Sequence, residues 1–212
     1  MGRKLTVSEI LGEAARLASA NAGVAIACVF GLATLNVVLD QVMPGNASTL
    51  PAALANLGAG YVLISLMLTS LGLREGKSGF DAFFGVNFLA GLCIVLGMIL
   101  LIVPGLILAA RWSAANAALL AEGDGVSAAL RRSWHMTGPS LWPIIGIQLL
   151  IFVPALVVAF GALLALDAAM PIAASAIMYV VLFAASTFSW AAGVAIYSLL
   201  RPETDTLAEV FA

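Results

Sequence analysis

Apolar runs long enough to cross a lipid bilayer recur along the whole chain, separated by short breaks that hold proline, glycine or charged residues. A spanning helix needs about 20 apolar residues, each adding 1.5 Å of rise. Of the 212 residues, 63% are hydrophobic and only 9% are charged, whereas a soluble domain carries about 25% charged residues. The chain is therefore expected to be an all-α integral membrane protein. The composition excludes a soluble enzyme and a disordered chain, and the net charge of −2 excludes a nucleic-acid binder.

The runs predict a bundle of six transmembrane helices within residues 18–200. Residues 1–17 are expected to form an interfacial helix, residues 126–136 a second one, and residues 201–212 a short tail. The segment 86–121 fits either one long bent helix or two helices folded at Pro104-Gly105. With two helices, the spans lie near residues 18–39, 52–73, 86–103, 106–121, 141–166 and 172–200.

The distribution of lysine and arginine favours six crossings with both ends in the cytoplasm. With five crossings, Arg131 and Arg201 would lie on opposite sides of the membrane. With six crossings and the N-terminus inside, the three outer turns contain no lysine or arginine, as the positive-inside rule requires. The basic residues then on the cytoplasmic side are Arg3, Lys4, Arg16, Arg74, Lys77, Arg131, Arg132 and Arg201.

A weak repeat precedes every second span. Residues 6–11, 79–84 and 125–130 each begin with a small residue and continue with apolar positions at helical spacing. This pattern predicts three units, each made of a short interfacial helix followed by a transmembrane hairpin.

Arg111 is the most unusual residue, because it follows Pro104-Gly105 in a short apolar segment. An arginine at mid-membrane costs about 2.5–3.5 kcal/mol on insertion scales, so it faces a bundle interior, a wet cavity or lipid phosphate. One interpretation is a site for an anion or a lipid headgroup. The other is that Arg111 extends to the membrane interface, where the adjacent Trp112 is also at home.

A polar cluster surrounds Arg131 and Arg132. We expect these arginines to contact anionic headgroups from an interfacial helix that also carries Trp134. An enzyme would need His135 as a base, but Ser133 lies only two residues away and does not face it on a helix. The candidate anion or headgroup residues are therefore Arg111, Arg131 and Arg132, and the candidate interface residues are Trp112, Trp134, Pro104 and Gly105. No catalytic, cofactor or metal site is expected.

Amide side chains in the spans, such as Asn87, Asn116 and Gln148, are expected to hydrogen-bond between helices, although they could also line a substrate path. Small residues four apart predict two packing faces. These stripes are Gly23, Ala27 and Gly31 in the first span and Ala185, Ser189 and Gly193 in the last.

Three stretches together resemble a bacterial membrane-protein family. They are residues 101–112 (LIVPGLILAARW), the Glu122-Gly123 pair and residues 128–134 (AALRRSW). The family is the membrane domain found fused to some glycerophosphodiester phosphodiesterases, related to YciC-like inner-membrane proteins. The resemblance covers residues 89–142 well and implies a multi-pass protein of the bacterial inner membrane. In fused members the phosphodiesterase is a separate soluble barrel, so no enzymatic activity is expected of this chain.

The expected function is non-enzymatic binding of anionic lipid or of a partner protein in an envelope role. A homo-oligomer is compatible with the small-residue stripes, and neither a cofactor nor nucleic acid is expected. The alternative is a small transporter or permease component with Arg111 at an anion site.

Overall fold

The computed structural model describes residues 4–43, 45–74, 78–123, 125–166 and 168–201, and all regular secondary structure in these ranges is helical. Six helical segments are long and apolar enough to cross a membrane, which confirms the prediction of an all-α six-helix membrane bundle. The helices are α1 (Val7–Ala20), α2 (Ala22–Val42), α3 (Thr49–Ser70), α4 (Phe80–Leu100), α5 (Ile102–Arg111), α6 (Ala115–Glu122), α7 (Val126–Thr137), α8 (Leu141–Leu166) and α9 (Pro171–Leu200), with 3-10 turns at Gly45–Ser48 and Gly138–Ser140.

Helix α1 begins with a capping box, in which Thr6 and Glu9 satisfy each other's free backbone N–H groups. Its buried residues Ile10, Ala14 and Leu17 lie on one face, and α1 packs mainly against α9. The helix runs past residue 17 to Ala20 and is followed by Asn21, whose side chain donates to the Leu17 carbonyl at 3.0 Å. The first span therefore occupies Ala22–Val42 rather than residues 18–39.

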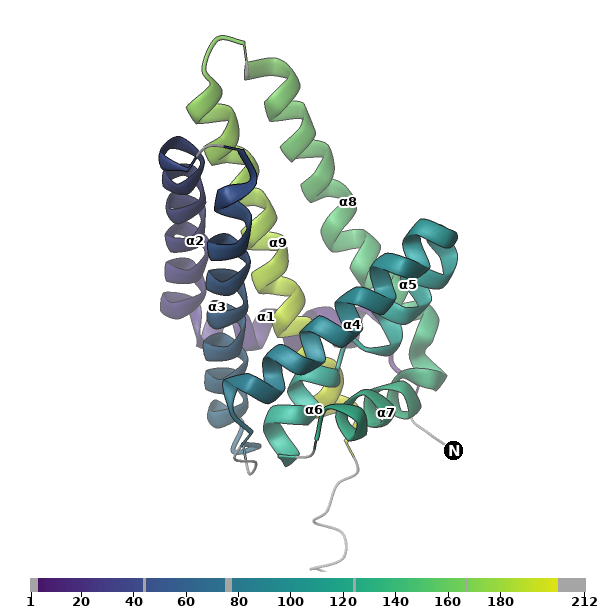
Figure 1. Ribbon diagram of the computed structural model, residues 1–212. Helices are drawn as coiled ribbons and strands as arrows, with labels where there is room; N and C mark the ends of the chain where they lie inside the picture. The colour runs from purple at the N-terminus through teal and green to yellow at the C-terminus, as the bar shows by residue number, and fades with distance from the viewer. Residues whose placement is uncertain (1–3, 44, 75–77, 124, 167, 202–212) are drawn as a thin grey trace, which may run out of the picture.

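Helices α2, α3 and α9 stand side by side, and α8 forms a long hairpin with α9 (Figure 1). The α4–α5 hairpin runs obliquely to them (Figure 1). The short α6 is the centre of the core at the end where α7 lies, and its residues from Ala117 to Ala121 are all buried.

Residues 86–121 belong to two helical segments, each long and apolar enough to span a membrane, rather than to one bent helix, but the turn is not at Pro104-Gly105. Leu101 has an extended backbone (φ −159°, ψ 131°) and ends α4. Pro104 lies inside the first turn of α5, where a missing N–H costs no helical hydrogen bond. Gly105 packs on α4 so closely that a Cβ there would lie 2.8 Å from the backbone nitrogen of Met98. Both residues thus belong to the helix contact.

Two further expectations differ from the structure. Residues 80–84 form the start of α4, so the second repeat unit has no separate interfacial helix. The α2 stripe is not a packing face, because Gly23, Ala27 and Gly31 are exposed and a Cβ on either glycine would meet nothing within 4 Å. By contrast, Gly193 in α9 is buried in a close contact with Ser113.

The tip of the α4–α5 hairpin is entirely apolar. Five consecutive large residues, Ile99 to Val103, are between 64% and 78% exposed, and the ten-residue α5 is only about 15 Å long, half the thickness of the hydrocarbon core. An exposed apolar run of this kind is unfavourable in water. We therefore expect the tip to lie within the bilayer. The turns between α2 and α3 and between α8 and α9 are expected to lie outside it.

Cysteine labelling tests this expectation. In a background with Cys28→Ala and Cys93→Ala, a Leu101→Cys thiol should react with a membrane-impermeant maleimide about tenfold more slowly than an Ala47→Cys thiol in the Gly45–Ser48 turn, because hydrocarbon disfavours the reactive thiolate. Equal labelling rates at the two positions would instead place the hairpin tip in water.

Candidate functional site

The fourth apolar segment is broken between α5 and α6. Residues 112–114 leave the α-helix, and the helix resumes when the Ala115 N–H donates to the Trp112 carbonyl at 3.0 Å. The Arg111 carbonyl instead accepts hydrogen bonds from two side chains of α7, from Ser133 Oγ at 2.7 Å and Thr137 Oγ1 at 3.1 Å. Both side chains are fully buried. This satisfies the rule that irregular backbone at membrane depth must be enclosed by protein.

The Arg111 side chain is held by the same helix. Its Nη1 donates to the Trp134 carbonyl at 3.0 Å, and its guanidinium carbon lies 4.9 Å from the centroid of the Trp134 ring. The Trp112 and Trp134 rings are themselves 6.2 Å apart. Within the described ranges, no carboxylate lies at ion-pair distance from Arg111. Backbone and side chain of Arg111 together therefore attach the end of α5 to α7 by hydrogen bonds and a cation–π contact.

A hydrogen-bonded network joins α6, α7 and α9 nearby. Arg132 forms an ion pair with Glu122, and Tyr197 donates to the same carboxylate at 2.8 Å. Arg131, one residue earlier on α7, is exposed, as is His135. Arg111, Arg131 and Arg132 thus have three different surroundings and do not form one site.

The inward face of α7 differs from the one that hydropathy indicates. The apolar Ala129 and Leu130 are buried, but Ser133 and Thr137 complete this face, and the apolar Trp134 is 37% exposed. The available signal was a serine and a threonine four residues apart, a spacing that puts two hydroxyls on the same side of a helix. The Ser133 hydroxyl donates to the Arg111 carbonyl rather than facing His135.

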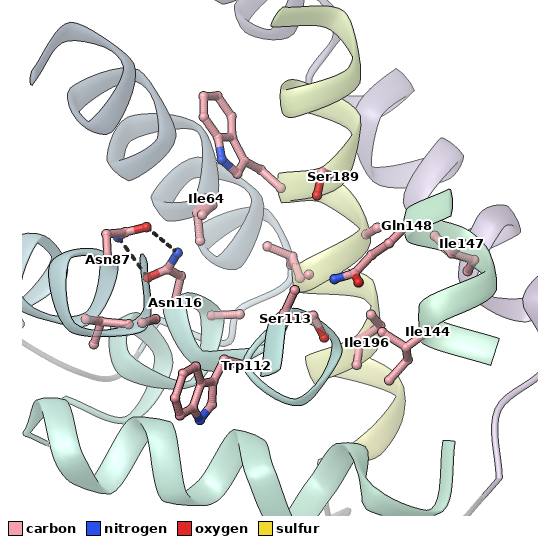
Figure 2. Close-up of a pocket in the computed structure, with 18 of the residues that line it drawn as sticks. Ile64, Asn87, Trp112, Ser113, Asn116, Ile144, Ile147, Gln148, Ser189 and Ile196 are labelled. Atoms are coloured by element: carbon pink, nitrogen blue, oxygen red, sulfur yellow. Dashed lines mark hydrogen bonds between the residues drawn. The ribbon is translucent and has the colours of Figure 1, made fainter. Parts of the chain in front are cut away.

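A cavity of about 270 Å³, lined mainly by apolar residues with a few amides and hydroxyls among them, lies beside the break, between residues of α3, α4, α5, α6, α8 and α9. Figure 2 shows a pair of asparagines on one side and Gln148 and Ser189 on the other. Asn87 of α4 and Asn116 of α6 exchange amide hydrogen bonds of 3.0 and 3.2 Å, as expected of residues that bond helices together. Gln148 does not follow this expectation, because its buried Oε1 has no partner among the described residues.

The lining of this cavity bears on the predicted site residues. Trp112 and Ser113 line it, whereas Arg111 does not, and none of the described residues that line it is charged. Among the described residues, no group of three or more His, Cys, Asp or Glu side chains comes together that could hold a metal ion.

Comparisons of the chain with protein-family models, curated proteins and solved structures find no match. The resemblance to the phosphodiesterase-fused membrane domain remains a prediction from the residues quoted above.

Proposed function

We propose that this multi-pass protein resides in the bacterial inner membrane, binds anionic lipid headgroups at its cytoplasmic end and catalyses no reaction. The six apolar helices support the membrane location, and the resemblance of residues 89–142 supports the choice of membrane. Basic residues gather at the end of the bundle where α1 and α7 lie. By the positive-inside rule, this distribution supports a cytoplasmic orientation for that end.

The exposed side of α7 carries this proposal. Arg131 is exposed there, with Trp134 nearby, and Trp142 at the start of α8 is 77% exposed. Arginine and tryptophan are the residues favoured at the level of the headgroups. Since Arg111 and Arg132 have internal partners, Arg131 is the residue of the three that is best placed for lipid phosphate.

Arg131→Gln is expected to lower the retention of phosphatidylglycerol about fivefold relative to phosphatidylethanolamine, because each surface arginine contributes about 1 kcal/mol to binding an anionic surface. The measurement is native mass spectrometry of the protein extracted from vesicles that contain both lipids.

Arg16→Gln is the matched control, because Arg16 already binds Glu13 through hydrogen bonds of 2.9 and 2.5 Å. These bonds hold the pKa of Glu13 below its usual value, so the carboxylate remains charged and the guanidinium remains engaged. Its replacement should change lipid retention little. Equal losses in both variants, or none in Arg131→Gln, would contradict a headgroup site at Arg131.

The alternative of a transporter with Arg111 at an anion site receives less support. The Arg111 guanidinium contacts a carbonyl and an aromatic ring of α7, and it does not line the cavity. These contacts favour a structural role for Arg111.

A further inference from the structure

We propose that the cavity between α4, α6, α8 and α9 binds a neutral, hydroxyl-bearing group. This site is separate from the headgroup contact at Arg131 and does not depend on it. The proposal rests on the volume of the cavity, on the polar atoms that line it and on the absence of charge from its described lining.

The polar atoms of the lining offer both donors and acceptors. The Asn87–Asn116 pair uses one N–H of each amide for the other, and Asn87 Nδ2 also donates to the Phe83 carbonyl at 2.8 Å. Ser113 Oγ donates to the Ala110 carbonyl at 2.9 Å, so its lone pairs stay available. A hydroxyl group both donates and accepts, so it fits such a mixed set better than a group with one capacity only.

Gln148 supplies the most specific observation. Its Oε1 is buried and has no hydrogen-bond partner among the described residues, although it lines the cavity. Figure 2 shows the Gln148 side chain directed from α8 towards Ser113. An unpaired amide oxygen inside a membrane bundle is costly, and a ligand O–H within the cavity would satisfy it.

The absence of charged residues from the described lining of the cavity favours a neutral ligand. A buried charge requires a charged or metal partner, and the described lining offers only amides, hydroxyls, tryptophans and apolar side chains. The nearby Arg132 and Glu122 are engaged with each other outside the cavity. A phosphate or carboxylate would therefore lose its hydration without compensation, whereas a neutral hydroxyl group would not.

The volume of the cavity limits the size of the ligand. A volume of about 270 Å³ equals that of about nine waters at 30 Å³ each. It admits a group such as a glycerol moiety. That moiety could come from a free polyol or from the head of a neutral glycerolipid such as diacylglycerol.

The test is native mass spectrometry of the detergent-solubilised protein incubated separately with dioleoylglycerol, free glycerol and dioleoylphosphatidylglycerol. We expect a one-to-one adduct with dioleoylglycerol if the source is a lipid, or with glycerol if it is a free polyol. In either case Gln148→Leu should lower its abundance about tenfold, the effect of losing a buried hydrogen bond. Phosphatidylglycerol should give only the adducts that depend on Arg131, unchanged by Gln148→Leu.

A second variant tests the site by filling it. Gly91 lines the cavity and a Cβ there would meet nothing within 4 Å, so Gly91→Leu should occupy the space and abolish the adduct. Gln41→Leu and Gly161→Leu are the matched controls, since both positions are exposed and neither lines the cavity. Thermal unfolding followed by circular dichroism establishes that each variant is folded.

The proposal is overturned if neither neutral probe forms an adduct with the folded parent protein. An adduct that survives in folded Gln148→Leu and Gly91→Leu would overturn it equally. A phosphatidylglycerol adduct that is lost in these two variants but kept in Arg131→Gln would show that the cavity takes an anion, against the charge argument.

Discussion

Gly193→Ala is expected to lower the free energy of unfolding by about 3 kcal/mol, the upper range of overpacking costs. Gly193 is buried in α9, and a Cβ there would lie 2.6 Å from the carbonyl oxygen of Ser113. That oxygen belongs to the irregular backbone of residues 112–114, so neither side of the contact can move without disturbing the α5–α6 break. The change can be measured by unfolding in mixed micelles with increasing SDS, followed by circular dichroism.

Gly161→Ala provides the control with the opposite sign. Gly161 is an exposed helical position in α8 where a Cβ would meet nothing within 4 Å. Alanine there should stabilise the protein by about 0.5–1 kcal/mol, because glycine in a helix loses more backbone entropy on folding. If Gly193→Ala were as stable as Gly161→Ala, α9 would not pack against the break as described.

Ser133→Ala combined with Thr137→Val is expected to destabilise the protein by more than the sum of the single changes, with a coupling of about 1–2 kcal/mol. Ser133 alone still donates to the Arg111 carbonyl, and the single proton of Thr137, which also lies 2.8 Å from the Ser133 carbonyl, can turn to Arg111 when Ser133 is replaced. Removing both leaves a buried carbonyl without a donor, which costs about 1–3 kcal/mol. A double-mutant cycle of unfolding free energies measures the coupling.

Ser127→Ala is the control for this cycle, because Ser127 is an exposed serine on the same helix. Its replacement should change stability by no more than about 0.5 kcal/mol. Strictly additive effects at Ser133 and Thr137 would mean that the two hydroxyls do not share one acceptor.

The number of spans could be predicted from the sequence because burying apolar side chains in lipid requires long uninterrupted runs. The long run at residues 141–166 is bounded by polar residues on both sides, and α8 occupies the same residues. The α4–α5 turn could not be placed in this way, because residues 93–110 contain no polar side chain to mark it. Pro104 suggested a turn, yet proline is equally compatible with the first turn of a helix.

The break at residues 112–114 also lacks a local signal, since neither glycine nor proline occurs there. It depends on partners distant in the sequence, namely Ser133 and Thr137 at the Arg111 carbonyl and Gly193 at the Ser113 carbonyl. Similarly, both small-residue stripes have the same spacing, and only the tertiary arrangement distinguishes the contact at Gly193 from the exposed Gly23 and Gly31.

The sequence indicates which residues are unusual for an apolar segment, but it does not indicate what their side chains contact. Arg111 stands out because a charge in an apolar segment needs an explanation, and its contacts with Trp134 supply a structural one. The partner of Asn87 could not be read from the sequence, because Asn116 lies 29 residues away on another helix. The unpaired oxygen of Gln148 is likewise visible only in three dimensions.

We infer that Arg111 holds α7 against the broken span rather than binding an anion, and Arg111→Gln measured with two readouts tests this role. The substitution should lower the free energy of unfolding by about 1–2 kcal/mol, from the lost cation–π contact and charged hydrogen bond. The folded fraction should retain phosphatidylglycerol over phosphatidylethanolamine as the parent protein does. Unchanged stability together with lost phosphatidylglycerol retention would instead identify Arg111 as an anion site and contradict its structural role.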